Sequence, residues 1–195
     1  VLQCQEKISQ IMQVLKLDTR VEKIIIATRG PVYINGEVKG GFTEKSVAES
    51  LTSLNMRNVN KLTYDMYTSS FNKTMASLDK IMHVREVYYL LENPELDFLP
   101  KEVVYRPFDY FDMPENRNTM ESGLYLKRMS VYKEGIESIK SKKLHVLDPL
   151  PAMCEKEQCH SVIDGGFLYA DDDHFSVFGA EYIANYFKND IWGIR

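Results

Sequence analysis

The chain is poor in several features that mark particular classes of protein. It has three cysteines and one tryptophan among its 195 residues, and no apolar stretch approaches the roughly 18 residues that a membrane-spanning helix requires. Basic residues number 24 against 28 acidic ones, which gives a formal net charge of −4 at pH 7. Because no excess of positive charge is available to neutralise phosphates, nucleic acid is not expected as a partner.

The N-terminal residues lack the marks of a chain start or of a secretory signal. The sequence begins at Val1 rather than at a methionine, and no basic segment precedes an apolar one. We therefore expect the chain to be an interior piece of a longer protein. With 44% hydrophobic and 27% charged residues, positions 1–195 are expected to form one domain with a sizeable core.

Two of the three cysteines, Cys154 and Cys159, lie close together in the sequence. They could close a small disulfide loop, which requires an oxidising compartment. They could also form half of a zinc site with His160, but such sites usually combine two sets of ligands and the sequence has no second set. The disulfide is the favoured interpretation, and Cys4 then either pairs outside this chain or stays free.

Short β-branched segments alternate with helical patterns along the chain. Buried strands are predicted at residues 21–28, 86–91 and 144–148. Helices are predicted at residues 3–16, 42–54, 64–81, 119–142 and 177–187, the last one capped by Ser176. A surface segment with three prolines is predicted at residues 95–118, and a short edge strand at residues 167–169. The alternation predicts an α/β fold with a mainly parallel sheet.

Polar residues follow the ends of the predicted strands. Arg29 and Gly30 come after the first strand, Asn93 after the second, and Asp148 ends the third. Functional groups in parallel sheets gather at the carboxyl ends of the strands. We therefore expect these residues and the loop at 171–174 to share one edge of the sheet.

The most informative segment runs from Tyr169 to Ser176 and contains Asp171 three residues before His174. On a turn, a carboxylate at this spacing reaches the imidazole Nδ1 and fixes the tautomer of the ring. Nε2 is then left to take a proton from a hydroxyl nucleophile, as in Ser-His-Asp sites. The spacing thus makes His174 a candidate general base and Asp171 its orienting acid.

Other interpretations of the acidic run remain open at this point. Three aspartates in a row are often only a solvated turn. Clustered carboxylates also suit calcium or magnesium, so a metal-binding domain that uses Asp171, Asp172, Asp173 and His174 is an alternative. The calcium-loop pattern with its internal glycine and final glutamate is absent.

Further sequence features lie in a fixed order around this loop. Asp148-Pro149 is followed by Cys154 and Cys159, and then by Tyr169, Asp171, His174, Phe175-Ser176 and Gly179-Ala180. Upstream, a strand runs into Arg29 and Tyr33, and Asn93-Pro94-Glu95 follows the next strand. Over roughly residues 20–187 these blocks resemble the SGNH hydrolases, the Ser-Gly-Asn-His esterase superfamily. The resemblance is strongest to the extracytoplasmic SGNH domain fused to membrane acyltransferases of family three, which O-acetylate bacterial surface polysaccharides.

The resemblance implies a three-layer α/β/α, flavodoxin-like fold with a mainly parallel sheet. It also implies that Asp171 and His174 are the catalytic acid and base, that Asp172 and Asp173 face solvent, and that no metal or diffusible cofactor is required. Gly30 corresponds to a position whose backbone N–H could approach an oxyanion, although a tight turn with positive φ would explain a glycine equally well. Arg29 could bind an anionic or sugar group or form a structural ion pair. Tyr33 could stack on a sugar ring or pack within its loop.

The sequence departs from the family at the nucleophile. The family places its serine in a Gly-Asp-Ser motif after the first strand, and neither this motif nor the superfamily's Gly-x-Asn-Asp block occurs here. We expect the first strand and its serine to lie upstream of Val1. The alternative is that this homologue has lost its nucleophile.

The expected function is that of an O-acyltransferase or esterase domain that acetylates hydroxyls of a bacterial surface polysaccharide, such as lipopolysaccharide, through an acyl-enzyme. Its expected partners are the polysaccharide acceptor, an acyl donor, and a membrane acyltransferase domain in the same chain or complex. We expect it to lie on the periplasmic or cell-surface side, tethered to the inner membrane. The alternative is an inactive SGNH-like module that binds polysaccharide or a membrane partner.

Overall fold

The structure is a computed structural model that describes residues 2–28, 30–31, 58–96, 98–100 and 119–193. Arg29, Tyr33, the helix expected at residues 42–54 and most of the surface segment expected at residues 95–118 lie outside the described residues.

Three parallel strands form the central sheet, as the sequence predicts. They are β1 (Lys23–Ala27), β2 (Glu86–Leu90) and β4 (Leu144–Leu147), and they lie in the order β1-β2-β4. β2 is the middle strand and three of its five residues are buried. A parallel strand covered on both faces is a continuous apolar or aromatic run in the sequence, and runs of this kind located these strands.

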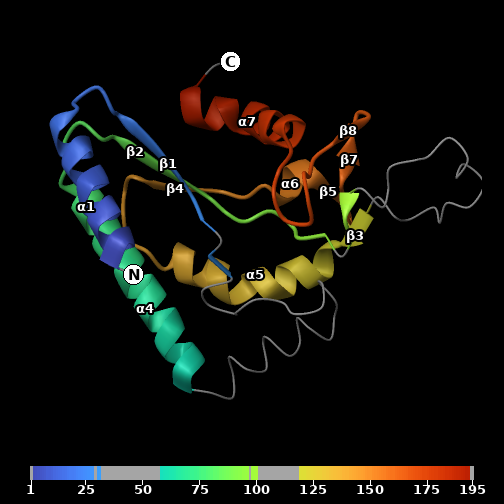
Figure 1. The fold of residues 1–195 in the computed structure, drawn as a ribbon, viewed down its shortest axis with the longest axis horizontal. Helices are drawn as coiled ribbons and strands as arrows, with labels where there is room; N and C mark the ends of the chain where they lie inside the picture. The colour runs from blue at the N-terminus through green and yellow to red at the C-terminus, as the bar shows by residue number, and fades with distance from the viewer. Residues whose placement is uncertain (1, 29, 32–57, 97, 101–118, 194–195) are drawn as a thin grey trace, which may run out of the picture.

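Helices cover both faces of the sheet (Figure 1). They are α1 (Leu2–Leu17), α4 (Asn58–Asp79), α5 (Ser122–Glu137), the short α6 (Leu150–Met153) and α7 (Val177–Trp192). Alternate side chains of β2 point to opposite faces. The Tyr88 hydroxyl donates to the backbone carbonyl of Asp190 in α7 (3.0 Å), whereas the Tyr89 hydroxyl meets tyrosines of α4 and α5 on the other face. The chain therefore has the three-layer α/β/α architecture.

A cluster of four hydroxyl groups links β1 and β2 to the helices beneath them. The Tyr89 hydroxyl contacts those of Thr28 (2.5 Å), Tyr67 (2.8 Å) and Tyr132. Burial raises the pKa of Tyr89 and of Tyr132, so both hydroxyls stay protonated. The cluster satisfies polar groups that would otherwise be costly to bury, and it fixes the place where the chain leaves β1.

Small antiparallel pairings lie outside the main sheet, and they correct two predictions. β3 (Thr119–Glu121) pairs with β6 (Gln158–His160), so the helix expected from residue 119 begins at Ser122. β7 (Val162–Ile163) pairs with β8 (Gly166–Phe167), and Tyr169 forms a bridge with Phe175. The edge strand expected at residues 167–169 is therefore confirmed only in part: Phe167 belongs to β8 and Tyr169 forms a bridge, and both lie outside the main sheet.

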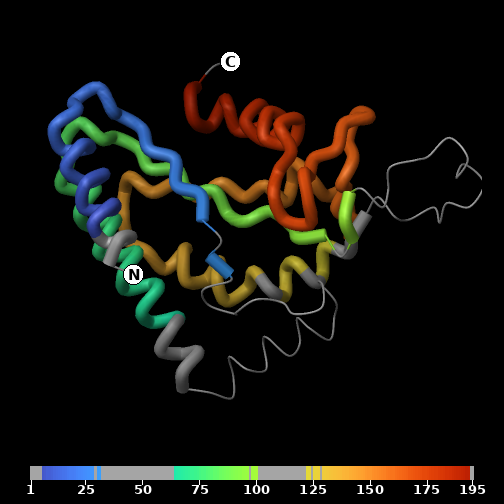
Figure 2. The backbone as a smooth tube through the Cα atoms, viewed as in Figure 1, coloured from blue at the N-terminus to red at the C-terminus, as the bar shows by residue number. Residues whose placement is uncertain are grey.

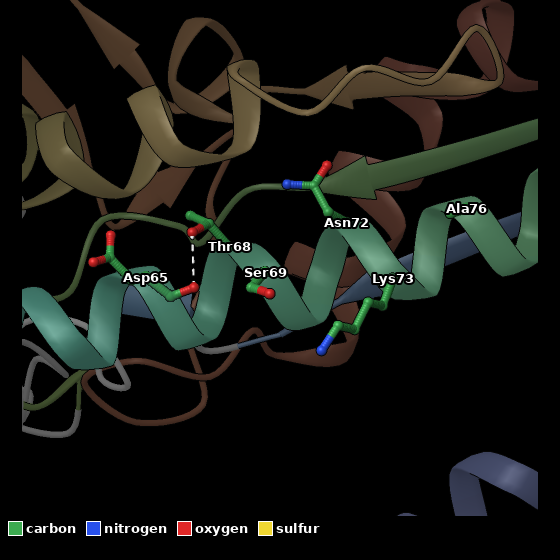
Figure 3. Close-up of a pocket in the computed structure, with 6 residues that line it drawn as sticks. All are labelled: Asp65, Thr68, Ser69, Asn72, Lys73 and Ala76. Atoms are coloured by element: carbon green, nitrogen blue, oxygen red, sulfur yellow. Dashed lines mark hydrogen bonds between the residues drawn. The ribbon is translucent and has the colours of Figure 1, made fainter.

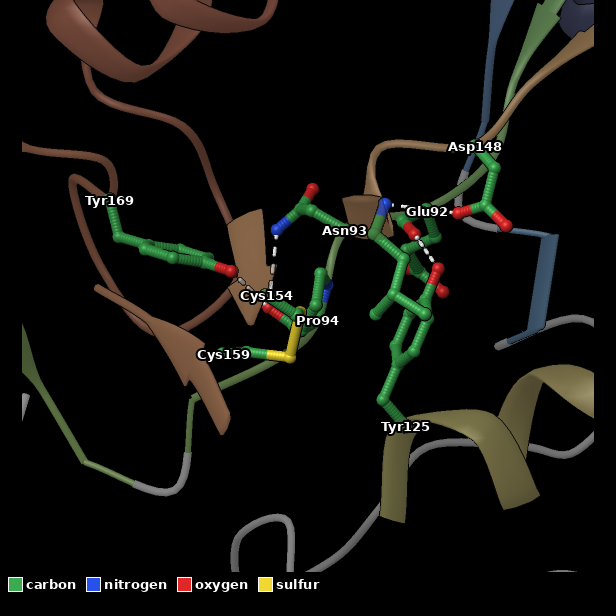
Figure 4. The surroundings of a disulfide bond; sticks show 9 residues. Glu92, Asn93, Pro94, Tyr125, Asp148, Cys154, Cys159 and Tyr169 are labelled. Carbon is green, nitrogen blue, oxygen red and sulfur yellow. Dashed lines mark hydrogen bonds between the residues drawn. A yellow bond between two sulfur atoms is a disulfide. The ribbon is translucent and has the colours of Figure 1, made fainter. Parts of the chain in front are cut away.

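A disulfide closes the hairpin of β5 (Cys154–Glu155) and β6. The Cys154 and Cys159 sulfurs lie 2.03 Å apart, and the Cys159 side chain is buried. Figure 4 shows this bond beside Pro94, which follows β2, and near Tyr169. The hairpin thus adjoins the segments that form the candidate site.

Candidate active site

The loop that carries His174 is closed at its base by backbone hydrogen bonds. The Ala170 N–H donates to the carbonyl of His174 (2.8 Å), and the Ser176 N–H donates to that of Leu168 (2.9 Å). The Ser176 hydroxyl accepts from the Gly179 N–H (2.9 Å) and so caps α7. His174 therefore sits at a fixed distance from the start of α7, on a tight loop.

Asp171 folds this loop around its own carboxylate. Its Oδ1 accepts the backbone N–H groups of His174 (2.7 Å) and Asp173 (3.1 Å), and its Oδ2 lies 3.0 Å from His174 Nδ1. Partial desolvation opposes ionisation, but these hydrogen bonds prevail and lower the pKa of Asp171 to about 2. A carboxylate only accepts hydrogen bonds, so Nδ1 carries the proton and Nε2 is available as a base when the ring is neutral.

Asp173 also faces the imidazole, and this corrects the expectation that it faces solvent. Its Oδ1 lies 2.6 Å from His174 Nδ1, and its side chain is only 14% exposed. Asp172 does have an exposed side chain, as expected. The turn around Asp171 redirects the chain, so neighbouring aspartates point in different directions, which linear spacing cannot reveal. Asp173 is the functional candidate that sequence reasoning missed.

The chain that leaves β2 is tied to the His174 loop by three hydrogen bonds. The Asn93 side-chain amide donates to the carbonyl of Asp173 (3.0 Å), and the Leu96 N–H donates to that of Asp172 (2.8 Å). The buried Tyr169 hydroxyl donates to the carbonyl of Pro94 (2.6 Å), as Figure 4 shows. Figure 2 follows the two segments side by side. The edge predicted from Asn93 and the 171–174 loop therefore exists.

A pocket of about 270 Å³ opens between these segments and the end of β1. Its lining combines apolar side chains, polar groups and the candidate base: Ala27, Thr28, Leu90, Leu91, Glu92, Asn93, Asp173, His174 and Phe175. Short apolar groups and hydroxyls could both be held there. The pocket places the imidazole at the carboxyl ends of β1 and β2, where parallel sheets usually carry their sites.

Two residues expected at this edge have structural roles. Asp148 forms an ion pair with Lys133 (2.9 Å) and accepts the Leu150 N–H (3.0 Å), and it is not part of the pocket lining. Gly30 is buried, and a Cβ built on it would lie 2.0 Å from a ring carbon of Tyr132. Its φ is not positive. Close approach of the Tyr132 ring, not a left-handed turn, therefore requires glycine here, and the oxyanion role of Gly30 stays a prediction.

A second hollow, of about 560 Å³, runs along α4 (Figure 3). Its lining residues all belong to that one helix: Asp65, Thr68, Ser69, Asn72, Lys73 and Ala76. The Thr68 hydroxyl is already engaged with the backbone carbonyl of Tyr64 (2.9 Å). No histidine lines this groove, whereas the first pocket holds the candidate base His174.

Asp171, Asp173 and His174 also offer three ligand atoms within 4.8 Å of one another. A metal ion bound by His174 would need an unprotonated ring nitrogen. Nδ1 lies 3.0 Å from Asp171 Oδ2, and in the tautomer that has its proton on Nδ1 this nitrogen donates to the carboxylate instead of binding a metal ion. The tautomer therefore decides between an oriented base and a metal ligand.

The structure therefore places His174, with Asp171 beside its Nδ1, in a pocket at the C-terminal edge of a three-layer α/β/α fold. The family model described as "SGNH domain (fused to AT3 domains)" matches residues 2–189, and the chain belongs to this family. The module is thus of the hydrolase and acyltransferase type. No curated protein matches the chain significantly, and no solved structure does so.

Proposed function

We propose that this domain supplies the acid–base part of a serine-dependent acyl-transfer site. The observation that carries the proposal is the His174 imidazole, which is held at Nδ1 by Asp171 and lines the pocket at the carboxyl ends of β1 and β2. No described residue forms a hydrogen bond with Nε2, the nitrogen that must exchange protons with a nucleophile. Membership of the SGNH family supports the same chemistry.

In the proposed reaction, a serine hydroxyl attacks the acyl carbonyl of the donor while its proton moves to His174 Nε2. The tetrahedral intermediate expels the donor's leaving group, which takes that proton, and an acyl-serine remains. An acceptor hydroxyl then loses its proton to Nε2 and takes the acyl group, and the serine recovers its proton. Asp171 stabilises the imidazolium in both steps. Because the sequence has no Gly-Asp-Ser motif, we place the serine on a segment outside these 195 residues.

We further propose that the acyl group is acetyl and that the acceptor is a hydroxyl of a bacterial surface polysaccharide. The pocket supports this assignment, because Leu91 and Phe175 provide apolar contact for a small acyl group. Thr28, Glu92 and Asn93 provide polar groups for sugar hydroxyls. The volume of about 270 Å³ suits a short acyl chain rather than a long one.

We propose an extracytoplasmic location, with the acyl group delivered by a membrane acyltransferase partner. Two observations support this: the Cys154–Cys159 disulfide, which persists in oxidising compartments, and a family description that names fusion to AT3 domains. Among the helices that the structure describes, none is long and apolar enough to span a bilayer.

The test is hydrolysis of p-nitrophenyl acetate by the protein expressed from its full gene. We expect His174→Ala to lower kcat/KM about 100-fold or more, and Asp171→Asn to lower it less. His145→Ala is the matched control: His145 is half exposed and stacks on Tyr88, and it is not part of the pocket lining. Equal activity of all variants, or an inactive but folded wild type, would instead favour a module that binds polysaccharide or a membrane partner.

A further inference from the structure

The two aspartates that face His174 differ in exposure. The side chain of Asp171 is 47% exposed, whereas that of Asp173 is 14% exposed. Both carboxylates approach the same imidazole nitrogen, at 3.0 Å for Asp171 and 2.6 Å for Asp173. The closer of the two is therefore also the one with less water around it, and water screens a charge most strongly where it is exposed.

Asp171 divides its negative charge among several donors. Its Oδ1 binds two backbone N–H groups, at Asp173 and His174, in addition to facing the imidazole. Its first task is thus to shape the turn. An asparagine at this position would keep an oxygen for those N–H groups and lose only the charge. Removing the charge of Asp171 therefore need not disrupt the loop.

Asp173 is placed by contacts from outside the loop. Its backbone carbonyl accepts the side-chain amide of Asn93, which follows β2, and the neighbouring Asp172 carbonyl accepts the Leu96 N–H. Asp173 also lines the pocket together with His174. The backbone of Asp173 is thus tied to the sheet edge as well as to Asp171 Oδ1, whereas the Asp171 carboxylate is held by groups of the loop alone.

We propose that Asp173 is a second positioning carboxylate for His174. Asp171 accepts the Nδ1–H, and Asp173 adds a poorly screened negative charge beside the same nitrogen, which stabilises the imidazolium formed in each proton transfer. This inference rests on the proposed function of His174 as the base. It follows that either carboxylate holds the ring when the other has lost its charge, and that removing both charges has a disproportionate effect.

The three consecutive aspartates provide a matched set of variants: Asp171→Asn, Asp172→Asn, Asp173→Asn and the double variant of Asp171 and Asp173. Initial rates with p-nitrophenyl acetate are measured on the full-length protein, with thermal unfolding to confirm folding. We expect kcat to fall about 10-fold in each of the Asp171 and Asp173 variants, and in the double variant to fall by more than about 100-fold, up to the loss caused by His174→Ala, with KM unchanged. Asp172→Asn should match wild type, and Asp173→Glu should recover activity. An Asp173→Asn rate equal to that of Asp172→Asn would overturn the proposal.

A second measurement does not depend on activity. ¹⁵N NMR of histidine-labelled protein at alkaline pH reports which imidazole nitrogen carries the proton. We expect His174 to be protonated at Nδ1 in wild type and in both single variants, and to lose that preference only in the double variant. If Asp171→Asn alone abolished the preference for Nδ1, Asp173 would not be holding the ring, and the proposal would be overturned. If the NMR result holds while His174→Ala stays fully active, the proposed function fails but the carboxylate contact does not.

Discussion

The side-chain amide of Asn93 donates a hydrogen bond of 3.0 Å to the backbone carbonyl of Asp173, and so joins the end of β2 to the loop of the candidate base. Asn93→Ala removes this link. We expect kcat to fall about 10-fold and the free energy of unfolding to fall by about 1–2 kcal/mol, because a half-buried carbonyl loses its donor. Enzyme kinetics and urea unfolding check both values. Ser77→Ala, which removes an exposed hydroxyl bonded to the Lys73 carbonyl on α4, should change neither.

Gly30 has no room for a side chain. A methyl group at this position would lie 2.0 Å from Cε2 of Tyr132, whose buried ring takes part in the hydroxyl cluster. Gly30→Ala should therefore lower the free energy of unfolding by about 1–3 kcal/mol, as overpacking does. Gly123→Ala is the control, because nothing lies within 4 Å of a Cβ there. Urea unfolding measures both variants, and equal stability of the two would contradict the packing described here.

The lowered pKa of Asp171 makes stability depend on pH in a defined direction. Its folded-state pKa is about 2 and its ordinary value is 3.8, so the folded state holds the ionised form more firmly. The resulting stabilisation is fully present above pH 3.8 and is lost as the pH falls through about 2. We expect the stability difference between wild type and Asp171→Asn to shrink over this window. Asp65→Asn, which alters an exposed carboxylate of α4, serves as the control in the same acid titration.

The disulfide contributes to stability chiefly through the unfolded state. Cys154 and Cys159 lie five residues apart, and a loop of that length corresponds to about 2 kcal/mol of lost chain entropy in the chain-entropy model. Wild type should lose about that much on adding dithiothreitol in a denaturant titration. The variant with alanine at both positions should be less stable from the outset and indifferent to the reductant. If dithiothreitol destabilised that variant by the same amount, the loss of stability would arise from a group other than this disulfide.

Metal ions should leave the protein unchanged. In the proposed tautomer His174 Nδ1 gives its proton to Asp171 and is not available as a ligand, and the carboxylates of Asp171 and Asp173 alone supply few of the oxygen ligands that a hard cation takes. Thermal unfolding with EDTA, and with added calcium, magnesium or zinc, is the measurement. A rise in Tm with one ion, abolished by EDTA and by Asp173→Asn, would support the metal-binding alternative instead.

The main sheet could be predicted from the sequence because the residue types within each strand already indicate that the strand is buried. Ile24 to Ile26 in β1 and Val87 to Leu90 in β2 are β-branched, aromatic or leucine throughout, as expected of strands between two layers of helices. The capping of α7 by Ser176 could also be predicted, because the hydrogen bond from the Gly179 N–H spans only three residues. The errors arose at β3, which pairs with the distant β6, and around β8, which pairs with the adjacent β7 in a tight hairpin. Strands of two or three residues leave no periodic signal.

The sequence by itself determined the α/β class, the family and the pairing of Asp171 with His174, because each depends on residues close together in the chain. Only the tertiary structure decided that Asp173 turns toward the imidazole, that Asn93 fastens the loop and that Tyr132 occupies the space beside Gly30. Each of these relations depends on the direction of a side chain after the chain has folded. That direction is set by a turn, or by packing against a distant element, and spacing along the sequence does not encode it.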